Sequence, residues 1–395
     1  MAIEIIEVKN LSKFRPNRET LYIIIEGSDL NELDDPTGQH FGYPENTVFC
    51  GFGHRLRATE HIPVVDGWVE LVDMTAGVLI PGCLLDKTIT KVPKGMPPGV
   101  WISAWLRHKL IPVYKTPGVS TTGPTPGPES LAQFDKCLES LGHKFKMSIL
   151  TPTYNRHDFL ERLMECVKAQ LTKVRHEWCI LDDSPQRIPD AALESLRKAV
   201  SIPVYYVWLS EKIPVGNKRN ILSGMATGWA SVNFDDDDFH HPERIKHSLF
   251  RMEQKKASLV GSSRCLLYLN DVIYQLRGFG PNHSTGGLMA FTKEYCRDHL
   301  FGEDIPNAEE AAFTNKFTVP MAQLDANKVI LIMSHSRNTY DKTAYVARSL
   351  GKTLDATKLG ICNYTKNKRL RKIFAEAFDQ ALLSESLPQT TTPSP

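Results

Sequence analysis

The segment Ala230–Arg244 reads ASVNFDDDDFHHPER and places four consecutive aspartates directly after a short apolar run. Adjacent carboxylates repel each other and raise each other's pKa unless a cation lies among them. Either water solvates these side chains on a surface loop, or a divalent cation binds there. The stretch ASVNF predicts a short buried strand, and Pro242 predicts that a helix begins soon after the aspartates. This position at a strand end favours the metal ion over the solvated loop.

Strand and helix patterns alternate on both sides of this segment. Strands are predicted over 145–153, 177–183, 202–209 and 230–234, and helices over 157–171, 189–200, 215–228 and 242–254. Two further strands over 265–269 and 272–277 are joined by an Asn-Asp turn, which is typical of a hairpin. Alternation with short connections predicts an α/β fold with a mostly parallel sheet flanked by helices. Such sheets bind ligands beyond the carboxyl ends of their strands, where TPTYNR, DDS and DDDD all fall.

Composition divides the chain into parts. The stretch 115–130 is rich in Pro, Gly, Ser and Thr and predicts a linker between an N-terminal domain (1–114) and a larger domain (131–383). The N-terminal domain is expected to be a smaller α/β unit. The polar, Pro-rich stretch 384–395 predicts a disordered tail.

Charge and cysteine usage exclude several classes of protein. The formal net charge of the 395-residue chain is +2, and no long basic stripe indicates a nucleic-acid partner. The 8 cysteines form no C-x-x-C pair, which argues against a zinc site and a disulfide framework. Acidic residues near the N-terminus do not fit a signal peptide, and no apolar stretch is long enough to be a transmembrane segment. A soluble cytoplasmic protein is therefore expected.

The polar residues after the first two strands have a functional and a structural interpretation. Asp182 and Asp183 could accept hydrogen bonds from a nucleobase or ribose, or they could form a turn, for which DDSP is well suited. Tyr154 could stack on a base to which Thr151 or Asn155 bonds. The same residues could form only a loop and a helix cap.

Later segments add candidate charges. Lys218 and Arg219 stand near a predicted helix start and could meet a diphosphate, or they could form a basic helix face. Glu309 and Glu310 could supply a general base if burial raises a pKa, although acids at a solvated helix start are common. His335 follows an apolar strand and could bind metal or phosphate, or be structural.

The order of these motifs over residues 146–342 resembles that of family 2 glycosyltransferases, whose fold is called GT-A. SILTPTYNR is similar to the family's opening strand and base-binding turn, and CILDDSP to its second-strand acid motif, with Ser-Pro in place of the usual Gly-Ser. NFDDDDFHHPERI resembles its D-x-D metal motif. VGNKRN, STGGLMAFTKEY and NAEEAAF resemble its Asn-containing helix start, its acceptor-side glycine segment and its catalytic-base motif.

The resemblance implies a role for each matching residue. It implies that the nucleotide is held by Thr151, Pro152, Tyr154, Asn155, Asp182, Asp183, Lys218, Arg219 and Asp236. It implies that Mn²⁺ or Mg²⁺ is held by Asp235, Asp237, Asp238 and His335, with Asp237 the foremost ligand. Glu310, or else Glu309, is implied as the base. No physical reason in the sequence explains why position 236 is also acidic.

The implied reaction is metal-dependent, inverting transfer from a nucleotide-diphosphate sugar, with UDP favoured, to a hydroxyl of a glycan or other acceptor. Two alternatives are a sugar-phosphate nucleotidyltransferase and a non-catalytic module that binds nucleotide sugars or glycans. The first normally has a glycine-rich phosphate loop, which TPTYNR lacks. The second is favoured if residues 309 and 310 lie far from the aspartates.

The N-terminal part departs from this pattern because it has no D-x-D motif. The interval Gly77–Trp101 roughly matches the interval Gly287–Phe313, with Pro98 and Gly99 where the later segment has its two glutamates. One hypothesis is therefore a degenerate or truncated glycosyltransferase-like unit. The other is an unrelated small domain.

Overall fold

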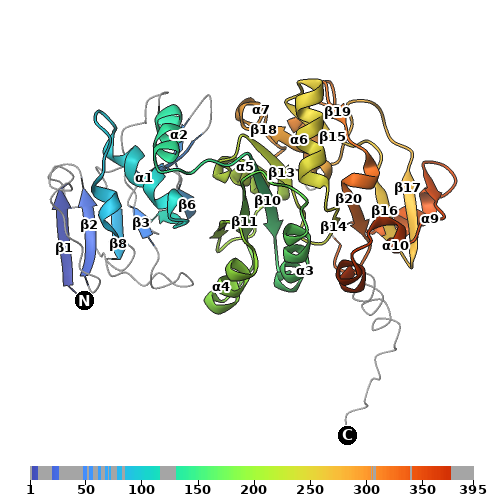
Figure 1. Cartoon of the computed structure of the whole chain (residues 1–395), viewed down its shortest axis with the longest axis horizontal. Helices are drawn as coiled ribbons and strands as arrows, with labels where there is room; N and C mark the ends of the chain where they lie inside the picture. Colours follow the sequence, from blue (N-terminus) through green and yellow to red (C-terminus); the bar gives the residue numbers. More distant parts are fainter. Residues whose placement is uncertain are drawn as a thin grey trace, which may run out of the picture.

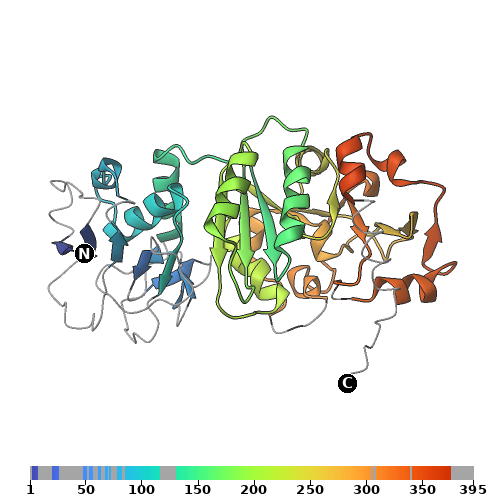
Figure 2. The ribbon, with the colours of Figure 1, turned by 90° about the horizontal axis from the view of Figure 1, so that it is seen from below.

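The structure is a computed structural model that describes residues 2–7, 20–25, 48–50, 53–56, 61–63, 67–69, 71–72, 78–81, 85–115, 130–303, 305, 308–338 and 340–374. The interior of the expected linker and the expected tail 384–395 lie outside these residues. A strand-rich N-terminal part and a larger α/β part lie side by side in both views of the chain (Figures 1 and 2).

A seven-stranded sheet in the order β12-β11-β10-β13-β18-β15-β19 forms the centre of the larger part. Its strands are β10 (Met147–Thr153), β11 (His176–Asp182), β12 (Val204–Trp208), β13 (Ala230–Asn233), β15 (Leu259–Gly261), β18 (Ala290–Thr292) and β19 (Ala322–Gln323). Pairing is parallel from β12 to β13 and between β15 and β19, and antiparallel on both sides of β18. The prediction of a mostly parallel sheet is confirmed.

Helices cover both faces of this sheet. Successive residues of a strand point to opposite faces, so each strand contributes side chains to both helix layers. Ile149 packs in the cluster that contains one group of helices, and Leu150 packs in the cluster that contains the other. The first group comprises α3 (His157–Lys168), α4 (Asp190–Ala199) and α6 (Arg244–Lys255). The second comprises α5 (Val215–Met225), α7 (Lys293–Asp298) and α8 (Glu310–Phe313). The predicted flanking helices are thus confirmed.

A second sheet, in the order β14-β20-β16-β17-β21, extends the fold beyond the aspartates. Its strands are β14 (Phe239–His240), β16 (Leu266–Leu269), β17 (Val272–Leu276), β20 (Ile330–Met333) and β21 (Leu354–Ala356). The predicted hairpin is confirmed: Asn270 and Asp271 have φ of 50° and 56°, as a two-residue type I′ turn requires. The aspartates therefore connect the first sheet, which they leave at β13, to the second, which they enter at β14.

Short helices complete this part of the chain. They are η4 (Gly286–Leu288), η5 (Ala326–Lys328), α9 (Lys342–Ser349) and α10 (Ile361–Tyr364). The segment NAEEAAF contains α8 (Glu310–Phe313), which is only four residues long. It ends because Asn315, Lys316 and Phe317 all have positive φ, a conformation that no right-handed helix contains.

The N-terminal part contains a six-stranded sheet in the order β1-β2-β8-β3-β9-β6 and a three-stranded sheet in the order β5-β4-β7. Its strands are β1 (Ala2–Glu7), β2 (Thr20–Ile25), β3 (Val48–Cys50), β4 (Gly53–Leu56), β5 (His61–Pro63), β6 (Gly67–Val69), β7 (Leu71–Val72), β8 (Val78–Pro81) and β9 (Val113–Lys115). Its helices are η3 (Lys87–Thr90), α1 (Pro98–His108) and α2 (Ser130–Ser140). The expected smaller α/β unit is confirmed as a fold class.

Helix α2 packs with the N-terminal core, although it follows the predicted linker. Phe134 and Leu138 of α2 join Trp101 and Trp105 of α1 in one buried cluster. The domain boundaries remain a prediction. So does the degenerate-unit hypothesis, because its marker Gly77 lies outside the described residues.

A buried ion pair connects α1 to the central sheet. Arg107 donates to Glu177 Oε2 of β11 at 2.8 Å and to the carbonyl of Met225 at 2.9 Å, and its guanidinium lies 3.9 Å from the centre of the Tyr205 ring. Glu177 also accepts hydrogen bonds from Ser148 and Thr227 at the amino ends of the strands. The two parts of the chain are therefore joined through a desolvated charge pair.

Six of the cysteines within the described residues are free. They are Cys137, Cys166, Cys179, Cys265, Cys296 and Cys362, and all but Cys362 are buried. Burial raises the pKa of Cys166 to about 12, so its thiol packs as a small apolar group. Among the described residues, no helix has both the length and the apolar character needed to cross a bilayer.

Candidate active site

Each of the four aspartates has its own set of partners. Asp235 pairs with Arg219 through two parallel hydrogen bonds, from Nη1 to Oδ1 at 2.9 Å and from Nη2 to Oδ2 at 3.1 Å. Such a bidentate pair is both strong and geometrically specific. Arg219 is buried, so this pair holds Asp235 firmly in one orientation.

Arg156 provides a cation among the four consecutive aspartates. Its Nη1 lies 3.0 Å from Asp236 Oδ1 and 3.0 Å from Asp237 Oδ2. Thr153, the last residue of β10, donates a further bond of 2.7 Å to Asp236 Oδ2. Burial and the neighbouring Asp237 nevertheless raise the pKa of Asp236 to about 7. Asp236 therefore attaches the run to the end of β10, which explains why this position is acidic.

Asp237 is the aspartate that meets His335. The distance from His335 Nε2 to Asp237 Oδ2 is 3.2 Å, and Asn338 Nδ2 donates to the same oxygen at 3.0 Å. Burial alone would raise the pKa of Asp237, but Lys342, His335 and Arg156 together hold it well below its usual range. Burial lowers the pKa of His335 and favours the neutral imidazole that ligates metals.

Asp238 points away from this group. Its Oδ1 accepts from the backbone N–H of Met333 in β20 at 3.0 Å, and Lys342 Nζ lies 3.9 Å from it. Burial raises the pKa of Asp238 to about 7, and although Lys342 opposes this shift, the charges of Asp237 and Asp235 add to it. Asp238 thus anchors the run to the second sheet.

Among the predicted metal ligands, the structure brings together Asp237 and His335. Within the described residues, no group of three or more His, Cys, Asp or Glu side chains is arranged to hold a metal. Mg²⁺ and Mn²⁺ are often held by only one or two protein groups together with substrate phosphates. An oxygen donor and a neutral nitrogen donor at 3.2 Å fit such a site.

The second-strand acids are buried and paired within the protein. Asp182 accepts from Tyr206 at 2.7 Å, from His157 at 2.9 Å and from the N–H of Ser184 at 3.0 Å. Although burial opposes it, these bonds lower the pKa of Asp182. The geometry is that of the turn interpretation, with the acid bonding two residues ahead.

Asp183 pairs with Lys218. Lys218 Nζ lies 2.6 Å from Asp183 Oδ1, and the N–H of Ile213 donates to Oδ2 of the same carboxylate at 2.9 Å. Lys218 also lies 5.7 Å from the centre of the Tyr154 ring, over the carboxyl end of β10. Lys218 and Arg219 are both buried in α5, so neither belongs to an exposed basic helix face.

The turn after β10 divides into a buried and an accessible half. Thr151 and Pro152 are buried, and Thr151 Oγ1 accepts from the indole of Trp178 at 2.9 Å. Tyr154 is half-buried and lies beside Lys212, whereas Asn155 is exposed with φ of 53°. Of these predicted nucleotide contacts, only Tyr154 and Asn155 have side chains that a ligand can reach.

The glutamate pair lies next to the aspartates. Arg219 Nε donates to Glu309 Oε1 at 2.9 Å while the other end of the same guanidinium binds Asp235. Burial, and then the charge of Glu309, raise the pKa of Glu310 to about 7. One buried arginine therefore joins residues that are far apart in the sequence, and the second glutamate has the pKa of a general base near neutral pH.

Two glycines make room for this contact. A side-chain carbon at Gly287 would lie 2.4 Å from Asp235 Oδ2, and one at Gly286 would lie 2.9 Å from Glu309 Oε1. The carbonyl of Gly286 accepts from Asn233, and that of Gly287 from Arg244. The segment before β18 thus passes close against both acids.

Sequence reasoning did not single out Arg156, Thr153, Asn338 or Lys342. Arg156 and Thr153 belong to the motif TPTYNR, but nothing in a linear motif shows which aspartate they reach. Asn338 follows His335 by three residues and binds both His335 and Asp237. A search for side-chain amides near a candidate ligand could have identified it.

Part of the sequence also matches a known protein family. Residues 148–297 match the sequence model described as glycosyl transferase family 2. The chain carries a family 2 glycosyltransferase domain. The resemblance to this family is thereby confirmed for the matched segment. Its matched range includes the aspartates, Arg156 and Arg219, and it ends before the glutamate pair.

Solved structures similar to this chain include TarS 1–349 from S. aureus in complex with UDP-GlcNAc, at 17% identity and a TM-score of 0.41, covering 49% of this chain and 60% of that one. The mannosyltransferase PcManGT from Pyrobaculum calidifontis, in complex with GDP-Man and Mn²⁺, has 16% identity and a TM-score of 0.40, with 62% and 77% covered. This chain spans 60% of the length of the first TarS structure. No curated protein matches the sequence.

Proposed function

We propose that this transferase moves a sugar from a nucleoside diphosphate sugar, with UDP favoured, to a hydroxyl of a glycan acceptor, with inversion at the anomeric carbon. The observation that supports this most is the contact of Arg219 with both Asp235 and Glu309. It places the glutamate pair beside the aspartates at the carboxyl end of the sheet. A non-catalytic binding module has no need for that proximity.

Glu310 is the proposed base. Its carboxylate takes the proton from the acceptor hydroxyl, whose oxygen attacks the anomeric carbon while the bond to the diphosphate breaks. The bonding electrons leave with the nucleoside diphosphate. Because the pKa of Glu310 is about 7, a large fraction is ionised at neutral pH and can accept a proton.

Asp237 and His335 are the proposed holders of Mn²⁺ or Mg²⁺. When bound, such an ion offsets the charge that develops on the leaving diphosphate. Arg219, Asp235 and Glu309 then have a positioning role, since their mutual bonds fix the glutamate pair. Tyr154 and Asn155 are the proposed base contacts, because their side chains are accessible beside Lys212.

Nucleotide binding and turnover test this proposal. Thermal unfolding is measured with UDP, GDP and their sugar conjugates, with and without Mn²⁺, because ligands that bind the folded state raise Tm. A metal-dependent rise with at least one nucleoside diphosphate is expected in the wild type and is expected to vanish in Asp237→Ala. No rise with any nucleotide would refute the proposal.

The base assignment predicts a pH profile. Because the ionised carboxylate is the active form, kcat/KM rises with pH and levels off above an apparent pKa of about 7. Release of nucleoside diphosphate from the donor and a suitable acceptor measures the rate. Glu310→Gln retains nucleotide binding but loses turnover. Retained turnover in that variant would transfer the role to Glu309.

A further inference from the structure

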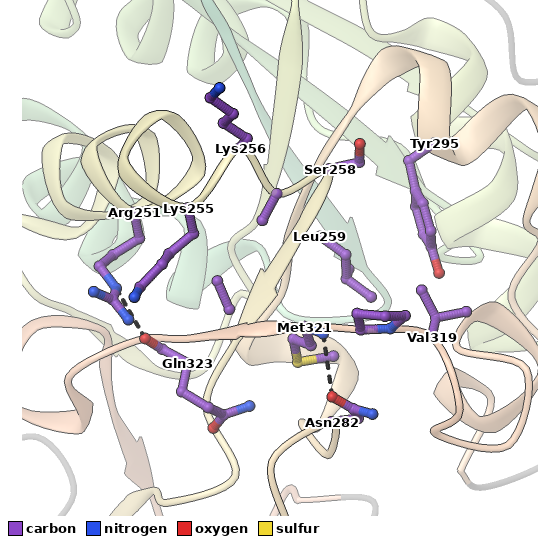
Figure 3. A pocket seen from close by; sticks show the side chains of 13 residues that line it. Arg251, Lys255, Lys256, Ser258, Leu259, Asn282, Tyr295, Val319, Met321 and Gln323 are labelled. Atoms are coloured by element: carbon purple, nitrogen blue, oxygen red, sulfur yellow. Dashed lines mark hydrogen bonds between the residues drawn. The ribbon is translucent and has the colours of Figure 1, made fainter.

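A groove opens at the end of the central sheet that lies opposite the aspartates, where β15 and β19 begin. It encloses about 620 Å³ and is lined by residues of α6, β15, β19 and the segments before and after β18 (Figure 3). Ligand pockets in proteins typically measure roughly 300–1,000 Å³, so this groove is large enough for a molecule rather than a single ion.

The charge of the groove has one sign. Arg251, Lys255 and Lys256 are among the thirteen residues that line it, and none of the thirteen is acidic. Within the described part of the chain, no carboxylate lies within ion-pair distance of these three cations. Arg251 and Lys255 are one helical turn apart and lie together on one side of the groove (Figure 3).

Arg251 is held in place for binding. Its Nε donates to the carbonyl of Gln323 at 3.1 Å (Figure 3). Its Nη1 donates to Gln254 at 2.6 Å. A fixed guanidinium loses less side-chain entropy on meeting a phosphate or carboxylate than a mobile one does. Lys255 is exposed beside it and adds a second positive charge.

The rest of the lining suits a sugar chain. Val319 and Pro320 give the groove accessible apolar surface, whereas Leu259 and Met321 are buried behind it. Asn282 is half-buried in the lining, and its Oδ1 accepts from the N–H of Met321 at 3.3 Å (Figure 3). Sugar rings have apolar faces and polar edges, so they match a lining of this kind. The groove is concave, whereas a bilayer presents a flat surface that could touch only its rim.

The groove is linked to the proposed active site through two segments of the chain. Tyr295 of the groove donates its hydroxyl to the carbonyl of Phe313 at 2.6 Å, at the end of the helix that begins with Glu310. Asn282 lies four residues before the glycine pair that contacts Asp235 and Glu309. A chain bound here therefore contacts the same segments that position the acids.

We propose that this groove binds an anionic stretch of the acceptor glycan, carrying carboxylate or phosphate groups, at a distance from the hydroxyl that reacts. The assignment of the bound chain as acceptor rests on the proposed function. The contact holds a long acceptor on the domain while its other end is at the reaction centre. It also restricts acceptors to glycans that are negatively charged.

Binding is tested with defined probes by fluorescence anisotropy. The probes are a polygalacturonate oligomer for carboxylates, inorganic polyphosphate for phosphates, a neutral dextran oligomer, and phosphatidylcholine vesicles that contain phosphatidylglycerol. The wild type is expected to bind at least one of the two anionic chains, more weakly as salt increases, and to bind dextran poorly. The double variant Arg251→Glu/Lys255→Glu is expected to lose at least about tenfold in affinity.

Matched controls make the outcome decisive. Lys352→Glu reverses the charge of an exposed lysine far along the chain and is expected to keep wild-type affinity. Lys255→Glu alone changes an exposed side chain, so its loss of affinity does not depend on the fold around Arg251. Equal affinity of the wild type and the groove variants, binding of vesicles only, or no binding of either anionic chain would overturn the inference.

Nucleotide binding in the same samples separates this inference from the proposed function. If UDP raises Tm in the presence of Mn²⁺ but no anionic chain binds, the groove assignment fails and the transferase proposal stands. If an anionic chain binds at the groove but no nucleotide binds, the groove stands as a glycan site and the proposed reaction fails. Transfer to acceptors with and without charged groups then measures the effect on KM.

Discussion

At the scale of single residues, the site is governed by two arginines rather than by the aspartates alone. Arg156 lies between Asp236 and Asp237, and Arg219 between Asp235 and Glu309. Four adjacent carboxylates would repel each other strongly in a buried site without such partners. The guanidinium groups therefore allow the chain to keep these acids at the end of a buried strand.

The first residue-scale prediction concerns Arg156→Gln. Removal of the cation leaves Asp236 and Asp237 side by side, and we expect a loss of about 3 kcal/mol in the free energy of unfolding, as for other broken buried pairs. Mn²⁺ is expected to recover part of this loss by replacing the missing charge. Chemical denaturation with and without Mn²⁺ measures both effects. The control is Arg175→Gln, which removes an exposed arginine. If Mn²⁺ stabilises Arg156→Gln no more than it stabilises this control, the result argues against Asp237 as a metal ligand.

The second residue-scale prediction concerns the stability cost of Glu310. Its pKa is about 7 in the folded protein against an ordinary value of 4.5, so the folded state binds more protons between these two values. Stability therefore falls as pH rises through this window, by up to about 3 kcal/mol. Glu310→Gln removes the penalty, so its Tm advantage over the wild type should be absent at about pH 4 and largest at about pH 8. An advantage that does not change with pH would contradict the raised pKa.

At the scale of elements, the glycine pair before β18 determines how closely the chain approaches the acids. We predict that Gly287→Ala displaces Asp235 from Arg219, because the new carbon would lie 2.4 Å from a carboxylate oxygen. The expected loss is about 1–3 kcal/mol of stability together with most of the activity. Gly360→Ala is a matched control, since its nearest neighbour lies 3.7 Å away. A stable and fully active Gly287→Ala enzyme would disprove the positioning role.

Element types and order were predictable from the chain, and their ends less so. The strands over 145–153 and 202–209 and the hairpin at Asn270 were predicted from apolar runs and turn residues, and they are present. The helix that begins at Glu310 is only four residues long, because three positive-φ residues follow it. Local propensity does not show where tertiary contacts stop a helix.

At the scale of the whole molecule, Arg107 joins the N-terminal part to the central seven-stranded sheet. We predict that Arg107→Leu costs about 3–5 kcal/mol, because it leaves Glu177 charged and buried without its cation. The double variant Arg107→Leu/Glu177→Gln is expected to be more stable than Arg107→Leu, since it removes the stranded charge. Denaturant unfolding of the single and double variants gives the coupling energy. Additive effects would show that the pair does not couple the two parts.

By itself, the sequence determined the α/β class and the family resemblance, and it indicated many candidate site residues, although not Arg156 or Asn338. Strand periodicity, turn chemistry and motif order are local properties, so they can be read without a structure. Only the tertiary structure decided the partners: Asp182 and Thr151 bond inward, Asp238 anchors a second sheet, and Arg219 joins Asp235 to a glutamate 74 positions later. These pairings depend on how strand ends and loops meet in space, and sequence spacing does not encode that meeting.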